Sequence, residues 1–140
     1  MAKTSIYLNF AGNCEEAFNN YRKIFGTEFS GKIFRMKDSG VPNLPAGEAN
    51  YIMNIALPIL GGTVIMGTDM LESMGHKLKI GNNTTINLEA DTRDEVDRLY
   101  KALSEGGSEM SPPADMFWGY WAVCLDRYGI RWMFNGPLKK

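Results

Sequence analysis

Polar side chains suited to holding a small molecule alternate with apolar ones in two segments of the sequence. Tyr7 and Asn9 take alternate positions in SIYLNF, and Thr85, Asn87 and Glu89 do so in TTINLEA. Successive residues of a strand point to opposite sides of a sheet, so each polar set lies on one side. Hydroxyl, amide and carboxylate groups on one surface can orient a ligand by hydrogen bonds. We therefore predict that both segments contribute to a ligand site.

Two later segments add a cation and two thioethers to this surface. By the same alternation Met66 lies on the polar side of its strand, and Arg131 and Met133 lie on that side of theirs. A guanidinium offers a planar fork of donors suited to a carboxylate or phosphate. If Thr85 and Met133 lie level on parallel strands, about 20 Å separates Arg131 from Glu89. We therefore predict that Arg131 is free to meet an anion.

Aromatic residues gather in the segment FWGYW, which adds Trp118 and Tyr120 to the predicted site. Such rings can stack on a planar ligand. Aromatic residues also dominate protein cores and dimer interfaces, so packing and dimer contact remain open alternatives for this segment.

The two cysteines and the one histidine are weaker candidates for chemistry. Cys14 and Cys124 are too few for a disulfide framework, and both are predicted to be free thiols. Cys14 falls in the first turn of a predicted helix, where the helix dipole favours a thiolate, although a small residue on a helix edge is the simpler interpretation. His76 stands alone in an irregular segment, where we expect a solvated loop residue rather than a ligand.

Charge and composition exclude several classes of protein. The chain carries 15 Lys and Arg against 16 Asp and Glu, without the basic patch of a nucleic-acid-binding protein. It lacks a signal peptide and any apolar run long enough to cross a membrane, so we predict a cytoplasmic protein with no membrane partner. It also lacks a nucleophile elbow, a phosphate-binding loop and a dinucleotide-binding turn, and we predict no cofactor.

The elements that position these residues repeat along the chain. In the first half, a strand at 5–10 leads to a helix capped by Asn13, with Glu16 completing a capping box, and then to strands near 28–36, 51–57 and 63–68. In the second half, a strand at 84–90 leads to a helix capped by Thr92, with Glu95 three residues on. Strands near 108–111, 117–125 and 129–135 follow it.

The opening strands match at an offset of 80 residues and the helices at 79. We therefore predict an α+β fold of two βαβββ modules, about 1–70 and 80–140, within a single domain spanning 1–140.

Motifs at both ends of the chain resemble the PhnB-like branch of the vicinal oxygen chelate superfamily. YLNF followed by GNCEEAF is similar to its opening, and FWG, DRYG and IRWMFN are similar to its terminus. The middle segment IALPILGGTVIMGTD resembles its hairpin. This resemblance implies paired βαβββ modules, the fold that the repeat predicts independently.

The resemblance also implies four metal-ligand positions, which metal-dependent members fill with His, Gln or Glu. Aligned by strands and turns, these positions fall on Ser5, Met66, Thr85 and Met133. The divalent cations of these enzymes are usually bound by carboxylate or imidazole ligands. We therefore predict no metal site. Members of this branch are often labelled demethylubiquinone methyltransferases, but we see no glycine-rich turn of the kind that S-adenosylmethionine-dependent enzymes usually carry.

The function predicted is metal-free binding of a small molecule in a concave cleft, by a homodimer, with no reaction assigned. Homodimerisation follows from superfamily precedent and from 16 aromatic residues, more than so small a core can hold. One alternative is a glyoxalase-type lyase or isomerase, using a metal or an acid–base pair such as Glu89 with Tyr7. Another is an interaction subunit without a ligand.

Overall fold

The computed structural model describes residues 1–140, which form two compact units, Met1–Lys79 and Ile80–Lys140. Each unit is built from one long helix and one four-stranded sheet. No helix has both the length and the apolar character needed to cross a membrane.

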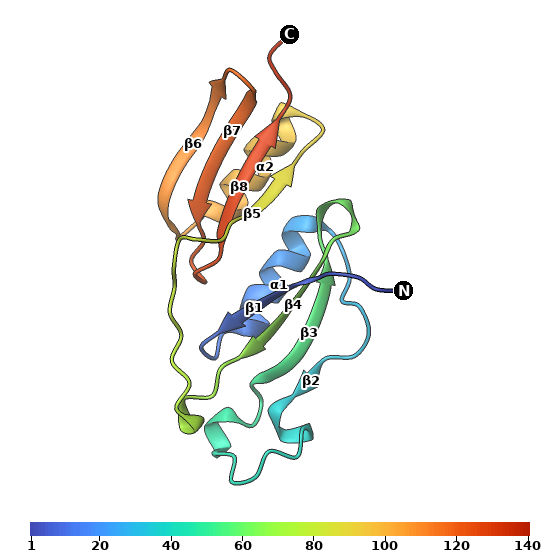
Figure 1. The fold of residues 1–140 in the computed structure, drawn as a ribbon, viewed down its shortest axis with the longest axis vertical. Coiled ribbons are helices and arrows are strands. Elements are labelled where there is room, and N and C mark those ends of the chain that lie inside the picture. Colours follow the sequence, from blue (N-terminus) through green and yellow to red (C-terminus); the bar gives the residue numbers. More distant parts are fainter. The chain divides into compact units, whose positions relative to one another are not determined.

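The first unit contains the elements expected of the first half of the repeat (Figure 1). They are β1 (Ile6–Phe10), α1 (Cys14–Phe25), β2 (Phe34–Arg35), β3 (Ile52–Pro58) and β4 (Val64–Asp69), with short 3-10 turns at Met36–Asp38, Ala46–Glu48, Leu60–Gly62 and Glu72–Met74. The sheet order is β1-β4-β3-β2, with β1 parallel to β4 and the other pairs antiparallel. The strand predicted near 28–36 shrinks to the two residues of β2, where the pairing with β3 is also irregular.

The second unit repeats this topology. Its elements are β5 (Ile86–Glu89), α2 (Arg93–Ser104), β6 (Ser108–Met116), β7 (Gly119–Leu125) and β8 (Arg131–Gly136). The sheet order is β5-β8-β7-β6, with β5 parallel to β8. The α+β fold of two βαβββ modules is therefore confirmed. β6 is longer than the predicted 108–111, since it runs on through Pro112 and Pro113 along the edge of the sheet, where a missing N–H is tolerated.

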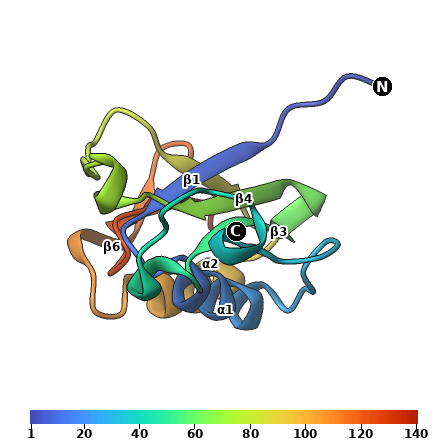
Figure 2. The ribbon, with the colours of Figure 1, turned by 90° about the horizontal axis from the view of Figure 1, so that it is seen from below.

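One face of each sheet packs against the helix of its own unit. In the first unit α1 lies along one side of β1, β4 and β3 (Figure 2), and Phe18 and Tyr21 are fully buried there with Phe10. A Cβ at Gly67 would lie 2.5 Å from the Phe18 ring, so only glycine lets helix and strand approach this closely. In the second unit Trp132 of β8 is fully buried. We call the opposite side of each sheet its open face, because the helix of its unit does not cover it.

The two helices begin differently. Thr92 accepts a hydrogen bond from the backbone N–H of Glu95, so the predicted cap of α2 is confirmed. The predicted capping box at Asn13 is wrong, because the Asn13 side chain makes no capping hydrogen bond. The Asp69 carboxylate replaces it, accepting from the backbone N–H of Gly12 at 2.9 Å and of Cys14 at 3.0 Å.

A second buried aspartate shapes the turn that precedes β8. The Asp126 carboxylate accepts hydrogen bonds from the backbone N–H groups of Tyr128 and Ile130, both at 2.9 Å, and from the Trp132 indole at 2.8 Å. Gly129 completes the predicted turn with a φ of 91°. This turn fixes where β8 starts and therefore which face Arg131 takes.

Candidate functional site

The open face of the first sheet carries the residues that alternation predicted. Leu8 and Phe10 are buried on the helix side, whereas Tyr7 and Asn9 are exposed on the open face. On the neighbouring strand Ile65 is buried and Met66, whose Cα is level with that of Tyr7, is half-buried.

Tyr7 is fixed on this face by strand β3. Its hydroxyl accepts a hydrogen bond from Asn54 Nδ2 at 3.1 Å and donates to the carbonyl oxygen of Met53 at 3.4 Å. Asn54 was not predicted as a site residue. Its place in the sequence offered a signal, because it precedes the apolar run IALP of a predicted strand, but β3 lacks a clean alternation.

A hollow of about 450 Å³ opens beside this pair. It is lined by one aromatic ring, one thioether and three polar residues, namely Phe34, Asp38, Ser39, Met53 and Asn54. Asn54 thus belongs both to the hollow and to the hydrogen bond with Tyr7. The hollow has the makeup of a small-molecule site, an apolar wall with a few polar groups.

The open face of the second sheet carries a chain of hydrogen bonds. The Trp118 indole donates to Asn135 Oδ1 at 3.1 Å, and Asn135 Nδ2 donates to Asn87 Oδ1 at 2.7 Å. Trp118 also lies edge-on to Trp121, with ring centroids 6.2 Å apart. Two indoles and two amides are therefore held together on this face, with Met133 half-buried on the strand that carries Asn135.

Tyr120 does not belong to this group, because it lies on the opposite side of the second sheet. Its hydroxyl donates to Asp97 of α2 at 2.7 Å, and the guanidinium of Arg93 lies 4.0 Å from its ring centroid. The hydrogen bond to Asp97, followed by burial, raises the pKa of Tyr120. Because β7 begins at Gly119, the alternation places Tyr120 on the helix side and Trp121 opposite Asn135.

Arg131 lies on the predicted face of the sheet, but its guanidinium is already paired with a carboxylate. The neighbouring Trp132 is buried against the helix side, so Arg131 takes the open side. Its Nη2 pairs with Glu109 Oε1 at 3.0 Å, while its Nε is buried without a hydrogen-bond partner. The missed partner sits on the edge strand β6, where Glu109 has an unusual positive φ of 48°.

The register of the second sheet also differs from the one assumed. Met133 is level with Asn87 and not with Thr85, which precedes β5 and is half-buried. Glu89 is level with Asn135, four residues from Arg131 along the strands, or about 13 Å at the usual rise. The pair that was excluded, Arg131 with Glu89, is indeed not formed, although the spacing is shorter than assumed.

The residues at the four positions that the resemblance implies for a metal do not fit a divalent cation. Ser5 Oγ lies 3.9 Å from the Met66 sulfur, so hydroxyl and thioether groups meet where a metal-dependent member would present imidazole or carboxylate. Thr85 and Met133 offer the same two kinds of group. No group of three or more His, Cys, Asp and Glu residues is arranged to hold a metal ion.

The cysteines are buried, while the histidine has a structural contact. Burial, and then the charges of Asp69 and Glu15, raise the pKa of Cys14 far above its usual range, so the reactive-thiolate alternative is wrong. Burial likewise raises the pKa of Cys124 to about 12. His76 Nδ1 accepts a hydrogen bond from the backbone N–H of Leu71 at 3.2 Å.

Comparisons with known proteins agree with this fold. A family model described as 3-demethylubiquinone-9 3-methyltransferase matches residues 2–134. The crystal structure of protein PA1353 from Pseudomonas aeruginosa is similar with 30% sequence identity and a TM-score of 0.80, covering 99% of this chain and 100% of that one.

Two further structures share the fold at lower identity. The PhnB protein from Bacillus cereus is 21% identical, with a TM-score of 0.78 and coverage of 96% of this chain and 99% of its own. A mutant of the fosfomycin resistance protein FosX from Listeria monocytogenes, in complex with Mn(II) and 1S,2S-dihydroxypropylphosphonic acid, is 15% identical. Its TM-score is 0.66, and the match covers 96% of this chain and 90% of that one.

Proposed function

This chain belongs to the PhnB-like family of the vicinal oxygen chelate superfamily, and on that premise we propose that it binds a small organic molecule without a bound metal. The observation that carries the proposal is the chain of hydrogen bonds from Trp118 through Asn135 to Asn87 on the open face of the second sheet. These side chains are already held in one arrangement before a ligand arrives. Less conformational entropy is then lost on binding.

The makeup of this face indicates the class of ligand. Trp118 is about half exposed, with a relative accessibility of 48%, so its ring can still gain contact by stacking on a planar group. The Arg131 guanidinium lies on the same face, four residues and about 13 Å along β8 from Asn135, and suits a carboxylate or phosphate, if that group replaces Glu109. The proposed ligand is therefore an elongated molecule of the aromatic carboxylate type, with a planar group at one end and an anionic group at the other, and a cytoplasmic location remains part of the proposal.

No reaction is proposed. The donor set at the positions that the resemblance implies for a metal does not suit a Lewis acid, and an exposed carboxylate such as Glu89 is by itself weak evidence for acid–base catalysis. The family's description as a methyltransferase does not carry over either. Both sheets here are mostly antiparallel, whereas S-adenosylmethionine-dependent methyl transfer usually goes with a parallel sheet.

Ligand-dependent thermal stability tests the proposal. Purified full-length protein is melted with a panel of aromatic carboxylates and of matched neutral amides, and hits are titrated by tryptophan fluorescence. We expect carboxylates to raise the melting temperature and amides to do so less. Asn135→Ala should weaken binding about tenfold, because it breaks both hydrogen bonds of the chain. Tyr120→Phe, on the other side of the sheet, should leave affinity unchanged.

Three results would reject the proposal. Equal stabilisation of the Asn135→Ala variant would place binding elsewhere. No stabilisation by any compound would favour the interaction subunit. Turnover of a methylglyoxal–glutathione hemithioacetal on addition of a divalent metal would favour the glyoxalase-type alternative.

A further inference from the structure

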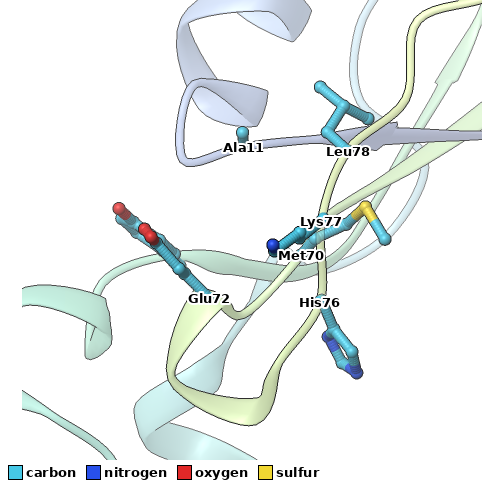
Figure 3. Close-up of a pocket in the computed structure, with 7 residues that line it drawn as sticks. Ala11, Met70, Glu72, His76, Lys77 and Leu78 are labelled. Atoms are coloured by element: carbon cyan, nitrogen blue, oxygen red, sulfur yellow. The ribbon is translucent and has the colours of Figure 1, made fainter.

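A second pocket lies in the first unit, away from the residues proposed above. It has a volume of about 350 Å³ and sits where β1 and β4 end and β3 begins (Figure 3). Three of its lining residues are apolar, namely Ala11, Met70 and Leu78, and the others carry polar groups, namely Tyr51, Glu72, His76 and Lys77.

The frame of this pocket is held by contacts that lie outside it. The backbone N–H of Met70 donates to the carbonyl oxygen of Phe10 at 2.7 Å, which ties the loop to the end of β1. The backbone N–H and the hydroxyl of Ser73 both donate to the carboxylate of the buried Glu48. The hydrogen bond from Leu71 to His76 closes the turn that presents Glu72 and Lys77.

Tyr51 forms a wall that the sequence specifically permits. A Cβ at Gly12 would lie 2.7 Å from the Tyr51 hydroxyl oxygen and 2.9 Å from the ring carbon that bears it, and Gly12 has a φ of 99°. Only glycine allows both this backbone conformation and this close approach. The Tyr51 hydroxyl is thus held against the chain beside the pocket.

Glu72 and Lys77 bring opposite charges to one pocket without neutralising each other. Both side chains are exposed, and neither forms an ion pair with any group of the protein. Figure 3 shows both extending from the same loop, while the His76 ring points away from them. A carboxylate and an ammonium group left unpaired around a hollow are complementary to a molecule that carries both charges itself.

We propose that this pocket binds a free α-amino acid with an apolar side chain. Glu72 receives the ligand's ammonium group, Lys77 its carboxylate, and Ala11, Met70 and Leu78 contact its side chain. The Tyr51 hydroxyl supplies a further hydrogen bond at the charged end. This site goes beyond the ligand site proposed above and does not depend on it.

L-Leucine and two derivatives test the charge assignment by calorimetric titration of the full chain. N-acetyl-L-leucine lacks the ammonium group and L-leucinamide lacks the carboxylate, so each should bind at least about tenfold more weakly than L-leucine. Glu72→Gln should lower the affinity for L-leucine about tenfold and leave the affinity for N-acetyl-L-leucine unchanged. Lys77→Met should lower the affinity for L-leucine and leave the affinity for L-leucinamide unchanged.

Matched variants separate this site from general effects. Lys79→Met and Glu16→Gln remove the same charges from exposed positions that do not line the pocket, and should bind L-leucine as the parent does. Asn135→Ala should also leave L-leucine binding intact. Either proposal, the amino-acid pocket or the ligand site on the open face of the second sheet, can therefore fail without the other. Absence of saturable L-leucine binding below about 10 mM, or equal binding of the three compounds, overturns the inference.

Discussion

The Asp69 carboxylate accepts a hydrogen bond from the backbone N–H of Cys14, 55 residues earlier in the chain, and so caps α1 from the end of β4. The same oxygen accepts from Gly12, and the second oxygen accepts from the backbone N–H of Ile52 at 2.8 Å. Asp69 is buried, with a relative accessibility of 3%. One side chain therefore joins the start of a helix to the start of β3.

Replacing Asp69 should destabilise the first unit strongly. Asp69→Ala leaves three backbone N–H groups without their acceptor, and each buried unsatisfied donor costs about 1–3 kcal/mol. We expect a loss of about 3–5 kcal/mol in the free energy of unfolding, measured by urea denaturation. Asp69→Asn keeps one oxygen and should lose less, and a loss below about 1 kcal/mol for the alanine variant would contradict this role.

The cap of α2 can be tested in the same way, but here the capping residue, Thr92, directly precedes the helix. Thr92→Ala removes the acceptor of the Glu95 N–H and should cost about 1 kcal/mol. Asn13→Ala, at the matching position before α1, should change stability by less than about 0.5 kcal/mol, because the Asn13 side chain caps nothing. Urea denaturation of both variants measures the two losses in the free energy of unfolding. Equal losses would show that Asn13 caps its helix in solution.

These two caps illustrate what the sequence could predict. Thr92 and its partner lie within one turn of helix, so a short motif specifies their hydrogen bond. Asn13 fits the same motif, but Asp69 competes successfully for the free N–H groups, and no local pattern reveals a partner 55 residues away. The repeat of strand, helix and three strands was predictable because burial imposes a period on each element.

The site was predictable only where strand alternation was unambiguous. Tyr7 and Asn9 were placed correctly because Leu8 and Phe10 are large and apolar. The side of the sheet that Tyr120 takes was not predictable, because both it and Trp121 are aromatic, and apolarity alone does not choose between them. Met133 is level with Asn87 instead of Thr85 because the turn before β8 sets the register of β8 against β5, and the hydrophobic period of a strand does not reveal this register.

The two thiols should respond to pH in a defined direction. In the folded chain the pKa of Cys124 is raised from 9.0 to about 12, so between these values the unfolded chain releases a proton that the folded chain retains. Stability contributed by this thiol is thus complete below pH 9 and falls above it, by at most about 1.4 kcal/mol per pH unit.

Urea denaturation from pH 8 to pH 10.5 measures this fall, and Cys124→Ala isolates it, because the other groups titrating there remain. The variant should lose less stability over that range than the parent. Neither native thiol should react with Ellman's reagent at pH 8, since both are buried. Rapid reaction of a native thiol would contradict the burial.

Oligomerisation remains a prediction for the whole chain. Phe117 has a relative accessibility of 90%, an exposure of aromatic surface that a partner would cover. We expect sedimentation at micromolar concentration to give a species of about twice 15.7 kDa. Phe117→Ser should shift it towards the monomer, and a parent sedimenting only as a monomer would exclude the homodimer.

Arg131 gives the sharpest test of the open face of the second sheet, because Glu109 and an anionic ligand would compete for one guanidinium. Glu109 is largely exposed, so its ion pair should contribute less than about 1 kcal/mol and be displaceable. Arg131→Met should weaken the binding of an aromatic carboxylate by about 1.5–3 kcal/mol. Glu109→Gln should strengthen this binding, because the ligand then no longer has to displace the Glu109 carboxylate from the guanidinium. Fluorescence titration of both variants with one carboxylate measures these opposite shifts. Weakening by both substitutions would instead indicate that the ion pair positions the face, and Arg131 would not be the group that meets the anion.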